Sequence, residues 1–493
     1  MGLVGVLAAG ALLVSGGREA DPETPAGLPG LPPPFLGVAV LGDGGLTAAV
    51  DAYGNVVDLR APGPAGRALI ENPAERQAAG TVEEDTGIQV WVRVGDEELP
   101  MWRADEVRQR YLPGTNVLRT EARFGAKRVR IEEAAHGGRL AIVAIGGSAS
   151  SIRLRVNAAG GAPTGSPRVI AEAAASDRGW LARSRPLGAG APPWATGMYE
   201  RSLLVLRALT DRRTGAVAAG ARDGWAYVWP RDAAAAAIAY AAAGYQPEAE
   251  LSTRFLLGLG LEHAARFEGD GSPVPGREAQ GDAIGWVAAA AEAAGVGNTR
   301  LAAHILSGGD PVPWRDRADY WEGEPGDYLG NALASGETAI KHLYGAKLPP
   351  RLVRRPGDPD SGLDSAAAWG VRPFPHPDLY PAIRGTMKAL TAQGTAFGIT
   401  PGEEWPGGED PWSAPTAWTA WSLAALGERR EALRLMGALR RSATPAGALP
   451  ERVAAATGIP RSTTPLAWSH AFAILALQQL WPSRTASTSP PSG

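Results

Sequence analysis

The stretch YVWPRDAAAAA, residues 227–237, decides the fold of the larger part of this chain. Pro230 has a fixed φ and no amide hydrogen, so it suits the first turn of an α-helix. The alanines that follow, and the apolar residues beyond them, continue that helix. The sequence therefore predicts a helix over 231–243 with Asp232 in its first turn, where the helix dipole favours a carboxylate.

Two tryptophans, Trp225 and Trp229, lie just ahead of this helix, close to Arg231 and Asp232. A capped helix with a surface ion pair would explain an isolated Arg-Asp sequence. A sugar site would also explain it, because flat aromatic faces cover a pyranose ring while charged side chains hold its hydroxyls. We favour the sugar site because the same combination of residues recurs downstream, ahead of other predicted helices.

Composition excludes several other kinds of protein. The chain has 493 residues, enough for two domains, and its 45% apolar and 20% charged residues are ordinary for a globular protein. Zero cysteines exclude disulfides and cysteine-ligated metal, and the six histidines lack metal-ligand spacing, so we expect no metal and no cofactor. A formal net charge of −3 gives no reason to expect a nucleic-acid partner.

The first residues resemble an export signal. Residues 1–17 form a short apolar run that ends in small residues, and residues 19–34 are rich in proline and acidic residues. The run is too short for a membrane-spanning helix and lacks a preceding Lys or Arg, so a ragged start is the competing interpretation. We expect 1–34 to be a signal peptide and linker, without another stable membrane partner. The protein is then secreted or extracytoplasmic, with a cytoplasmic location as the alternative.

From residue 35 to residue 157 the apolar pattern has a period of two, which is typical of β-strands. Gly-Asp-Gly, Tyr-Gly-Asn and Pro-Gly-Thr turns separate the runs. This pattern predicts an N-terminal antiparallel β-sandwich. The expected strands are 38–40, 47–50, 88–94, 117–124, 128–131, 140–145 and 152–156. Residues 158–195, rich in Gly, Ala and Pro, are expected to be a connector.

From about residue 196 to residue 482 the period is helical, and no strand pattern intervenes. Alanine-rich and amphipathic helices alternate, which suggests helical hairpins closed into an (α/α)6 barrel. The expected helices are 200–209, 231–243, 248–261, 280–294, 299–306, 327–344, 364–370, 379–391, 414–426, 428–441 and 465–480. Residues 483–493 are expected to be a disordered tail.

The loops between these helices carry the unusual chemistry. Loop 270–282 contains Arg277, Gln280 and Asp282, although an N-cap role for Asp282 is the favoured local interpretation. Loop 319–324 places Glu322 beside a tryptophan and a tyrosine, which would partly desolvate it and suit a general acid.

Two later loops repeat the pattern. Loop 403–412 packs four carboxylates with two tryptophans, and Glu451 stands beside Arg452, which should keep it ionised as a base. Four loops that combine tryptophan with carboxylates on one barrel point to a carbohydrate-active enzyme.

The order of these motifs resembles glycoside hydrolase family 15, the glucoamylase-like enzymes, in its prokaryotic form. The resemblance covers nearly all of the helical part and extends to Gly42-Asp43-Gly44 and Val50-Asp51 in the β part. The motifs that carry it are 201–215, 227–232, Tyr320-Trp321-Glu322, Leu449-Pro450-Glu451 and 462–469.

The resemblance implies an inverting, exo-acting hydrolase that releases β-glucose from α-linked gluco-oligosaccharides. It implies Glu322 as general acid and Glu451 as general base. The residues that it implies for the sugar-binding pocket are Arg231, Asp232, Trp229, Arg277, Gln280, Asp282, Trp321 and Trp412.

Two departures from the family leave the linkage preference open. Gly323 stands where fungal glucoamylases have a second acid, and Ile399-Thr400-Pro401 holds no arginine where many relatives have one. Trehalose and α-1,6-linked substrates suit the same acid–base pair, and a non-catalytic glycan-binding relative is the alternative of another class. The sequence makes no prediction of oligomeric state.

Overall fold

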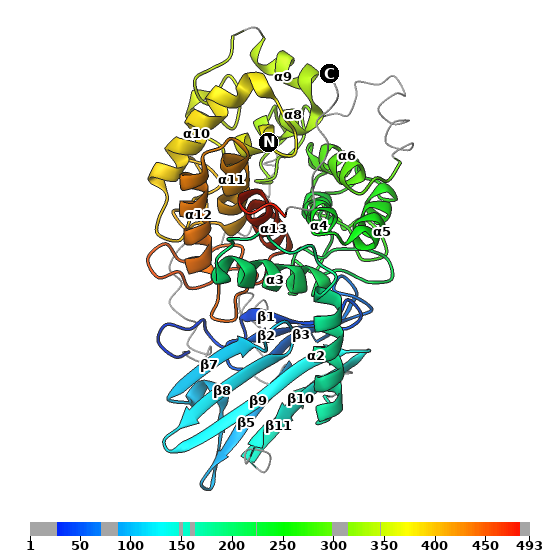
Figure 1. Ribbon diagram of the computed structural model, residues 1–493, viewed down its shortest axis with the longest axis vertical. Helices are drawn as coiled ribbons and strands as arrows, with labels where there is room; N and C mark the ends of the chain where they lie inside the picture. The colour runs from blue at the N-terminus through cyan, green and yellow to red at the C-terminus, as the bar shows by residue number, and fades with distance from the viewer. Residues whose placement is uncertain are drawn as a thin grey trace, which may run out of the picture.

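The computed structural model describes residues 27–70, 87–146, 151–157, 163–222, 224–297, 314–345 and 347–483. Figure 1 shows a β region at one end of the molecule and a helical region at the other. The expected apolar signal 1–17, the expected helix 299–306 and all but the first residue of the expected tail lie outside the described residues.

The N-terminal region consists of two antiparallel sheets, as the sequence predicts. The seven-stranded sheet has the order β1 (Gly37–Gly42), β2 (Thr47–Asp51), β3 (Val56–Ala61), β5 (Gly87–Val94) and β11 (Ile152–Asn157), with β4 (Arg67–Ile70) beside β3 and β6 (Glu97–Pro100) beside β5. The four-stranded sheet has the order β10 (Arg139–Ala144), β9 (Lys127–His136), β8 (Leu118–Phe124) and β7 (Glu106–Tyr111).

Side-chain alternation explains the clearest strands. In β8 every second residue is buried, because successive side chains of a strand point to opposite faces of the sheet. The sequence analysis did not predict β3, β4, β6 and β7. In β3 the buried pair Asp58 and Arg60 is joined at 2.9 Å, so two charged residues occupy core positions and hide the apolar pattern.

The helical region follows, and most of its helices match the predicted ranges. They are α3 (Pro193–Ala208), α4 (Pro230–Ala242), α5 (Gln246–Leu257), α6 (Ala283–Ala293), α8 (Leu329–Ser335), α9 (Glu337–Tyr344), α10 (Tyr380–Gln393), α11 (Ser413–Ala425), α12 (Arg429–Ser442) and α13 (Ala467–Leu480), with the short 3-10 helices η4 (Ser365–Gly370) and η5 (Pro377–Leu379).

Three of the predicted helices differ clearly from the structure, and the first is α3, which begins at Pro193, seven residues before the expected start at residue 200. The expected helix 327–344 is divided into α8 and α9 at Gly336, whose φ of 96° no helix accommodates. The expected helix 364–370 is the 3-10 helix η4, and its N-cap Asp364 accepts a hydrogen bond from the amide of Ala366 at 2.8 Å.

Six elements of the described part pack in a closed succession: α4 on α6, α6 on α8, α8 on η4, η4 on α11, α11 on α13, and α13 back on α4. Further helices pack outside them, with α5 against α4, α10 against η4, α12 against α11 and α3 against α13. In α4 and α13 nearly every side chain is buried, which small alanine side chains permit between two layers. The loops that lead into these inner elements are therefore all attached to one packed ring.

Helix α2 (Pro167–Leu181) lies in the segment that we expected to be a connector, and the sequence analysis did not predict it. In Figure 1 it runs alongside the strands, and its apolar residues Val169, Ile170, Ala173 and Ala174 form a core with β9 and β10. Helix α2 therefore packs as part of the β region, and α3 of the helical region follows it in the chain.

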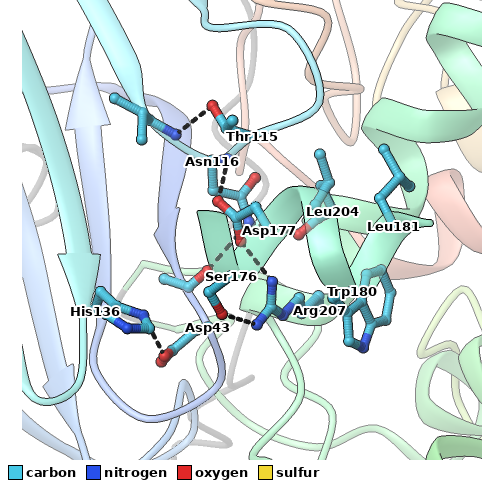
Figure 2. A network of polar contacts seen from close by, with 12 residues as sticks. Asp43, Thr115, Asn116, His136, Ser176, Asp177, Trp180, Leu181, Leu204 and Arg207 are labelled. Atoms are coloured by element: carbon cyan, nitrogen blue, oxygen red, sulfur yellow. Dashed lines mark hydrogen bonds and ion pairs between the residues drawn. The ribbon is translucent and has the colours of Figure 1, made fainter. Parts of the chain in front are cut away.

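A buried polar network joins this β region to the helical region (Figure 2). The Asp177 carboxylate of α2 accepts hydrogen bonds from the Arg207 guanidinium at 2.6 Å and from the Asn116 amide at 2.7 Å. The Asn116 side chain in turn donates to the carbonyl oxygens of Gly42 and Leu204, at 3.1 and 2.9 Å. One network thus links β1, the β7–β8 turn, α2 and α3.

Candidate active site

The start of α4 forms a buried anchor for the site. Arg231 is only 4% exposed, and its guanidinium donates hydrogen bonds to Asp282 at 2.7 Å and to the Gln280 side-chain oxygen at 2.9 Å. It also lies over the Trp468 ring, 4.9 Å from the ring centroid. The structure therefore brings together three of the residues that the sequence analysis assigned to the pocket wall.

The local interpretation of Asp282 as a helix cap is wrong. Asp282 occupies the N-cap position of α6, but its side chain makes no capping hydrogen bond. Its carboxylate is instead paired with Arg231, which comes from a different element of the ring. Because both side chains are almost fully buried, the pair fixes the start of α4 against the start of α6.

Asp232 is buried in the first turn of α4. Burial raises the pKa of its carboxyl to about 7, since the neighbouring Arg231 lowers it only in part and the charge of Glu451 raises it further. The two carboxyl groups thus interact electrostatically, although they are far apart in sequence. Near neutral pH the Asp232 carboxyl is present in both protonation states, so it can accept or donate a hydrogen bond.

Glu451 is held by contacts on its backbone and on its carboxylate. Its amide donates to the Thr463 carbonyl at 2.9 Å, and its carbonyl accepts from the Ser413 amide at 3.0 Å. The carboxylate accepts hydrogen bonds from the Trp225 indole at 3.2 Å and from the Ser462 hydroxyl. The sequence analysis did not predict the Ser462 contact, although Ser462 belongs to one of the motifs that carry the resemblance.

Our expectation that Arg452 keeps Glu451 ionised needs correction. Burial raises the pKa of Glu451, and the hydrogen bonds from Ser462 and Trp225 offset this more than the charge of Arg452 does. The Arg452 guanidinium lies 3.7 Å from Asp410 instead. Glu451 is therefore a half-buried carboxylate that neutral donors stabilise, and its affinity for protons is higher than that of an exposed glutamate.

Glu322 lies in a tight turn with a φ of 58°, in the left-handed region that residues other than glycine rarely adopt. Its side chain is 34% exposed and forms an ion pair with Arg277. The expectation that Trp321 partly desolvates Glu322 stays a prediction. The Trp321 ring packs against Trp405, at 5.0 Å between centroids, and under the Arg354 guanidinium at 4.1 Å.

Arg277 connects the two glutamates electrostatically. It is paired with Glu322, while burial and the charge of Arg266 lower its pKa and the charge of Glu451 raises it in part. The Arg277 guanidinium also lies 5.9 Å from the centroid of the Trp229 ring. Arg277 therefore contacts Glu322 and the Trp229 ring, and the charge of Glu451 acts on it.

Further aromatic rings pack in two groups, one around Trp405 and one around Trp468. Trp405 bridges Trp321 and Trp412, with its centroid 5.1 Å from that of Trp412. Tyr320 packs against the ring of Trp468, with 6.5 Å between centroids. The sequence analysis assigned Trp229, Trp321 and Trp412 to the pocket but not Trp405 or Trp468, whose contacts depend on segments far apart in the chain.

Other features of the described residues lie outside this site. A cavity of about 790 Å³ lies where the sheets meet the helical region, and its walls include Gly63, Arg139 and Arg212 but none of the site residues. Among the described residues, no group of three or more His, Asp or Glu side chains could hold a metal ion. In the same part of the chain, no helix has the length and apolar character that crossing a membrane requires.

A pH dependence of stability follows from a buried carboxyl beside the site. Burial raises the pKa of Asp364 from 3.8 to about 7, although the Tyr320 hydroxyl donates to it at 2.6 Å. The folded state then binds a proton that the unfolded state has lost, so this stabilisation is full below about pH 4 and is lost as the pH rises to about 7.

Over that pH range the free energy of unfolding should therefore fall less in Asp364→Asn than in the unmodified protein. We expect the difference to be on the order of a few kcal/mol. Urea unfolding at a series of pH values measures this free energy of unfolding for each protein. The exposed Asp360, changed to Asn, is the matched control and should leave the slope as it is. An unchanged slope in Asp364→Asn would show that Asp364 titrates as it does in the unfolded chain.

Comparisons with known proteins support the fold. The chain resembles the crystal structure of a bacterial glucoamylase complexed with acarbose, at a TM-score of 0.63 and 13% identity, over 94% of this chain and 96% of that one. No protein-family model matches the sequence, and no curated protein matches it.

Two further solved structures have lower TM-scores: a glycosidase, and a glucoamylase from Saccharomycopsis fibuligera. The glycosidase matches at a TM-score of 0.47 and 20% identity, over 62% of this chain and 98% of that one. The glucoamylase matches at 0.47 and 14% identity, over 58% and 94%. At these scores the two matches carry no argument. The bacterial glucoamylase match shows a common fold, an antiparallel β region followed by a helical region.

Proposed function

We propose that this protein is a glucoamylase-like glycoside hydrolase of family 15 that acts from the non-reducing end of α-linked gluco-oligosaccharides and inverts the anomeric centre. The substrate is an oligosaccharide or polysaccharide with α-1,4 or α-1,6 linkages. The observation that carries the proposal is the ion pair of Glu322 with Arg277, on whose pKa the charge of Glu451 acts, together with the buried Arg231 and Asp282 pair and a row of tryptophans.

Inverting hydrolysis requires two carboxyl groups with different roles. In our proposal Glu322 donates a proton to the glycosidic oxygen as the bond to the anomeric carbon breaks. Glu451 takes a proton from a water molecule, which attacks that carbon from the opposite face of the ring. The raised pKa of Glu451 increases its basicity, and the contacts from Trp225 and Ser462 fix the orientation of its carboxylate.

Arg277 has a specific part in this sequence of events. Its pairing with Glu322 favours the ionised carboxylate, whereas a general acid must carry a proton. We propose that a bound substrate separates the pair, since the glycosidic oxygen must take the place beside Glu322. Arg277 then remains near Glu451 and the sugar hydroxyls as a donor in the pocket wall.

The remaining assigned residues bind the terminal glucose. Asp232 is proposed to hold a hydroxyl of the sugar, and the anchor formed by Arg231, Gln280 and Asp282 keeps Asp232 in place. Trp229, Trp321 and Trp412 are proposed to cover its apolar faces. These contacts recognise the sugar in its ground state, so they govern affinity more than the rate of bond cleavage.

The proposal includes the (α/α)6 barrel. The closed succession of α4, α6, α8, η4, α11 and α13, with further helices packed outside it, supports this architecture. In such a barrel the loops before the inner helices meet at one end, which would gather the four tryptophan-containing loops. We also propose that the protein is secreted or extracytoplasmic, on the apolar run at residues 1–17.

A substrate panel tests the proposed function. Maltose, isomaltose, panose, trehalose and soluble starch are incubated with the protein, and released glucose is measured. Glucose from maltose, panose or starch is the expected result, and glucose from trehalose alone would make the protein a trehalase of the same family. Binding of these sugars without release of glucose would contradict the proposal and indicate a non-catalytic glycan-binding protein.

A further inference from the structure

A buried ion pair lies directly behind the turn that carries Glu322. The Asp319 side chain is 1% exposed and accepts two hydrogen bonds from the Arg354 guanidinium, at 2.7 and 2.9 Å. The same carboxylate accepts hydrogen bonds from the backbone amides of Trp321 at 3.2 Å and Gly323 at 3.3 Å. These two residues flank Glu322 on either side, so Asp319 holds the peptide groups before and after it.

The Glu322 amide closes the turn by donating to the Asp319 carbonyl at 2.9 Å. Arg354 also touches the turn directly. Its guanidinium lies 4.1 Å from the centroid of the Trp321 ring, and a Cβ added at Gly323 would come within 2.4 Å of the guanidinium. No side chain larger than hydrogen therefore fits at that position unless Arg354 moves.

The backbone at Glu322 needs this support. A residue other than glycine in the left-handed region costs about 1–2 kcal/mol, and such a conformation persists only where its surroundings determine it. The charged hydrogen bonds of Asp319 with Arg354 are stronger than neutral ones and geometrically specific. Burial lowers the pKa of Arg354, but its hydrogen bonds with Asp319 and the charges of Asp319, Asp364 and Tyr328 together raise it above its ordinary value.

We propose that Asp319 and Arg354 are positioning residues that hold Glu322 where it can protonate the leaving group. This inference rests on the proposed function of Glu322 as the general acid. Neither residue gives up or takes a proton in the reaction. Their effect is to fix the left-handed turn, and a displacement of about 1 Å at a catalytic group lowers the rate about a hundred-fold.

The leaving group of the substrate separates a positioning role from a general structural role. Maltose needs a proton on its departing oxygen, whereas α-glucosyl fluoride releases fluoride without one. We expect Arg354→Met, which keeps the packing against Trp321 and removes the paired hydrogen bonds, to lower kcat for maltose about a hundred-fold. Its kcat for α-glucosyl fluoride should stay close to that of the unmodified protein.

The neighbouring Arg355 supplies the matched control. It donates to the Tyr328 hydroxyl at 2.9 Å, and this hydroxyl donates to the Glu324 carbonyl, so Arg355 reaches the turn only through Tyr328 and beyond Glu322. We expect Arg355→Met to leave both rates nearly unchanged. The double variant Asp319→Asn with Arg354→Met removes both charges together, so it leaves no unpaired buried charge and guards against a failure to fold. Thermal melting is measured for each variant.

The expected result is a large loss on maltose and a small loss on α-glucosyl fluoride, in both the single and the double variant. Equal losses on the two substrates, or no loss on either, would overturn the positioning role while the proposed function stands. If the unmodified protein hydrolyses neither substrate, the proposed function itself fails, and the positioning role fails with it.

Discussion

Glu322→Gln is expected to lower kcat for maltose by about a hundred- to ten-thousand-fold with little change in KM. The amide has the shape of the carboxyl group but no proton to give to the glycosidic oxygen. The residues proposed to bind the sugar, Arg231, Asp232 and the tryptophans, are left in place by the substitution. Steady-state kinetics with maltose, together with calorimetric binding of an unreactive substrate analogue, measure the two effects separately.

The same turn offers a matched control in Glu324, which is exposed and lies two positions further along. Glu324→Gln should keep its activity if Glu322 is the acid. A loss of activity in Glu324→Gln together with full activity in Glu322→Gln would contradict these roles. Glu324 would then be the acid, and the turn held by Asp319 would have another purpose.

Glu451→Ala is expected to cause a loss of similar size, about a hundred- to ten-thousand-fold in kcat, because no group then removes a proton from the attacking water. The truncated side chain also leaves space beside the anomeric carbon. An added azide ion needs no base and can occupy that space. We expect azide to restore turnover of α-glucosyl fluoride and to yield β-glucosyl azide, identified by mass spectrometry and NMR.

Glu409→Ala, an exposed glutamate in the tryptophan-containing loop 403–412, is the control and should behave like the unmodified protein without azide. Full activity of Glu451→Ala would remove the role given to this residue. Formation of α-glucosyl azide would mean attack from the same face as the departing group, and Glu451 could not then be the base of an inverting reaction.

The sequence predicts helices best where local signals agree. Pro230 and the alanine run predict α4 to within one residue at each end. Helix α2 was missed because its residues lie in a stretch dominated by Gly, Ala and Pro, and its apolar face is recognisable only against β9 and β10. The break at Gly336 was missed because a single glycine within a helical pattern does not reveal its φ.

The sequence predicts the candidate site as a set of residues but not as a set of contacts. Motif order identified Glu322 and Glu451, whereas the pairing of Arg231 with Asp282 joins positions 51 residues apart in the chain. The sequence did not reveal where the Trp321 and Arg452 side chains point, because adjacency in sequence does not fix the orientation of a side chain. In both cases tertiary contacts, with Arg354 and with Asp410, decide the orientation.

The stereochemistry of the first product tests the central claim most directly. If Glu451 activates water, the two carboxyl groups lie about 6.5–9.5 Å apart in the complex, and the attack inverts the anomeric carbon. Proton NMR of the anomeric region in the first minutes of maltose hydrolysis should show β-glucose from the non-reducing unit before mutarotation. Early α-glucose from that unit would show retention and would contradict both the role of Glu451 and the inverting mechanism.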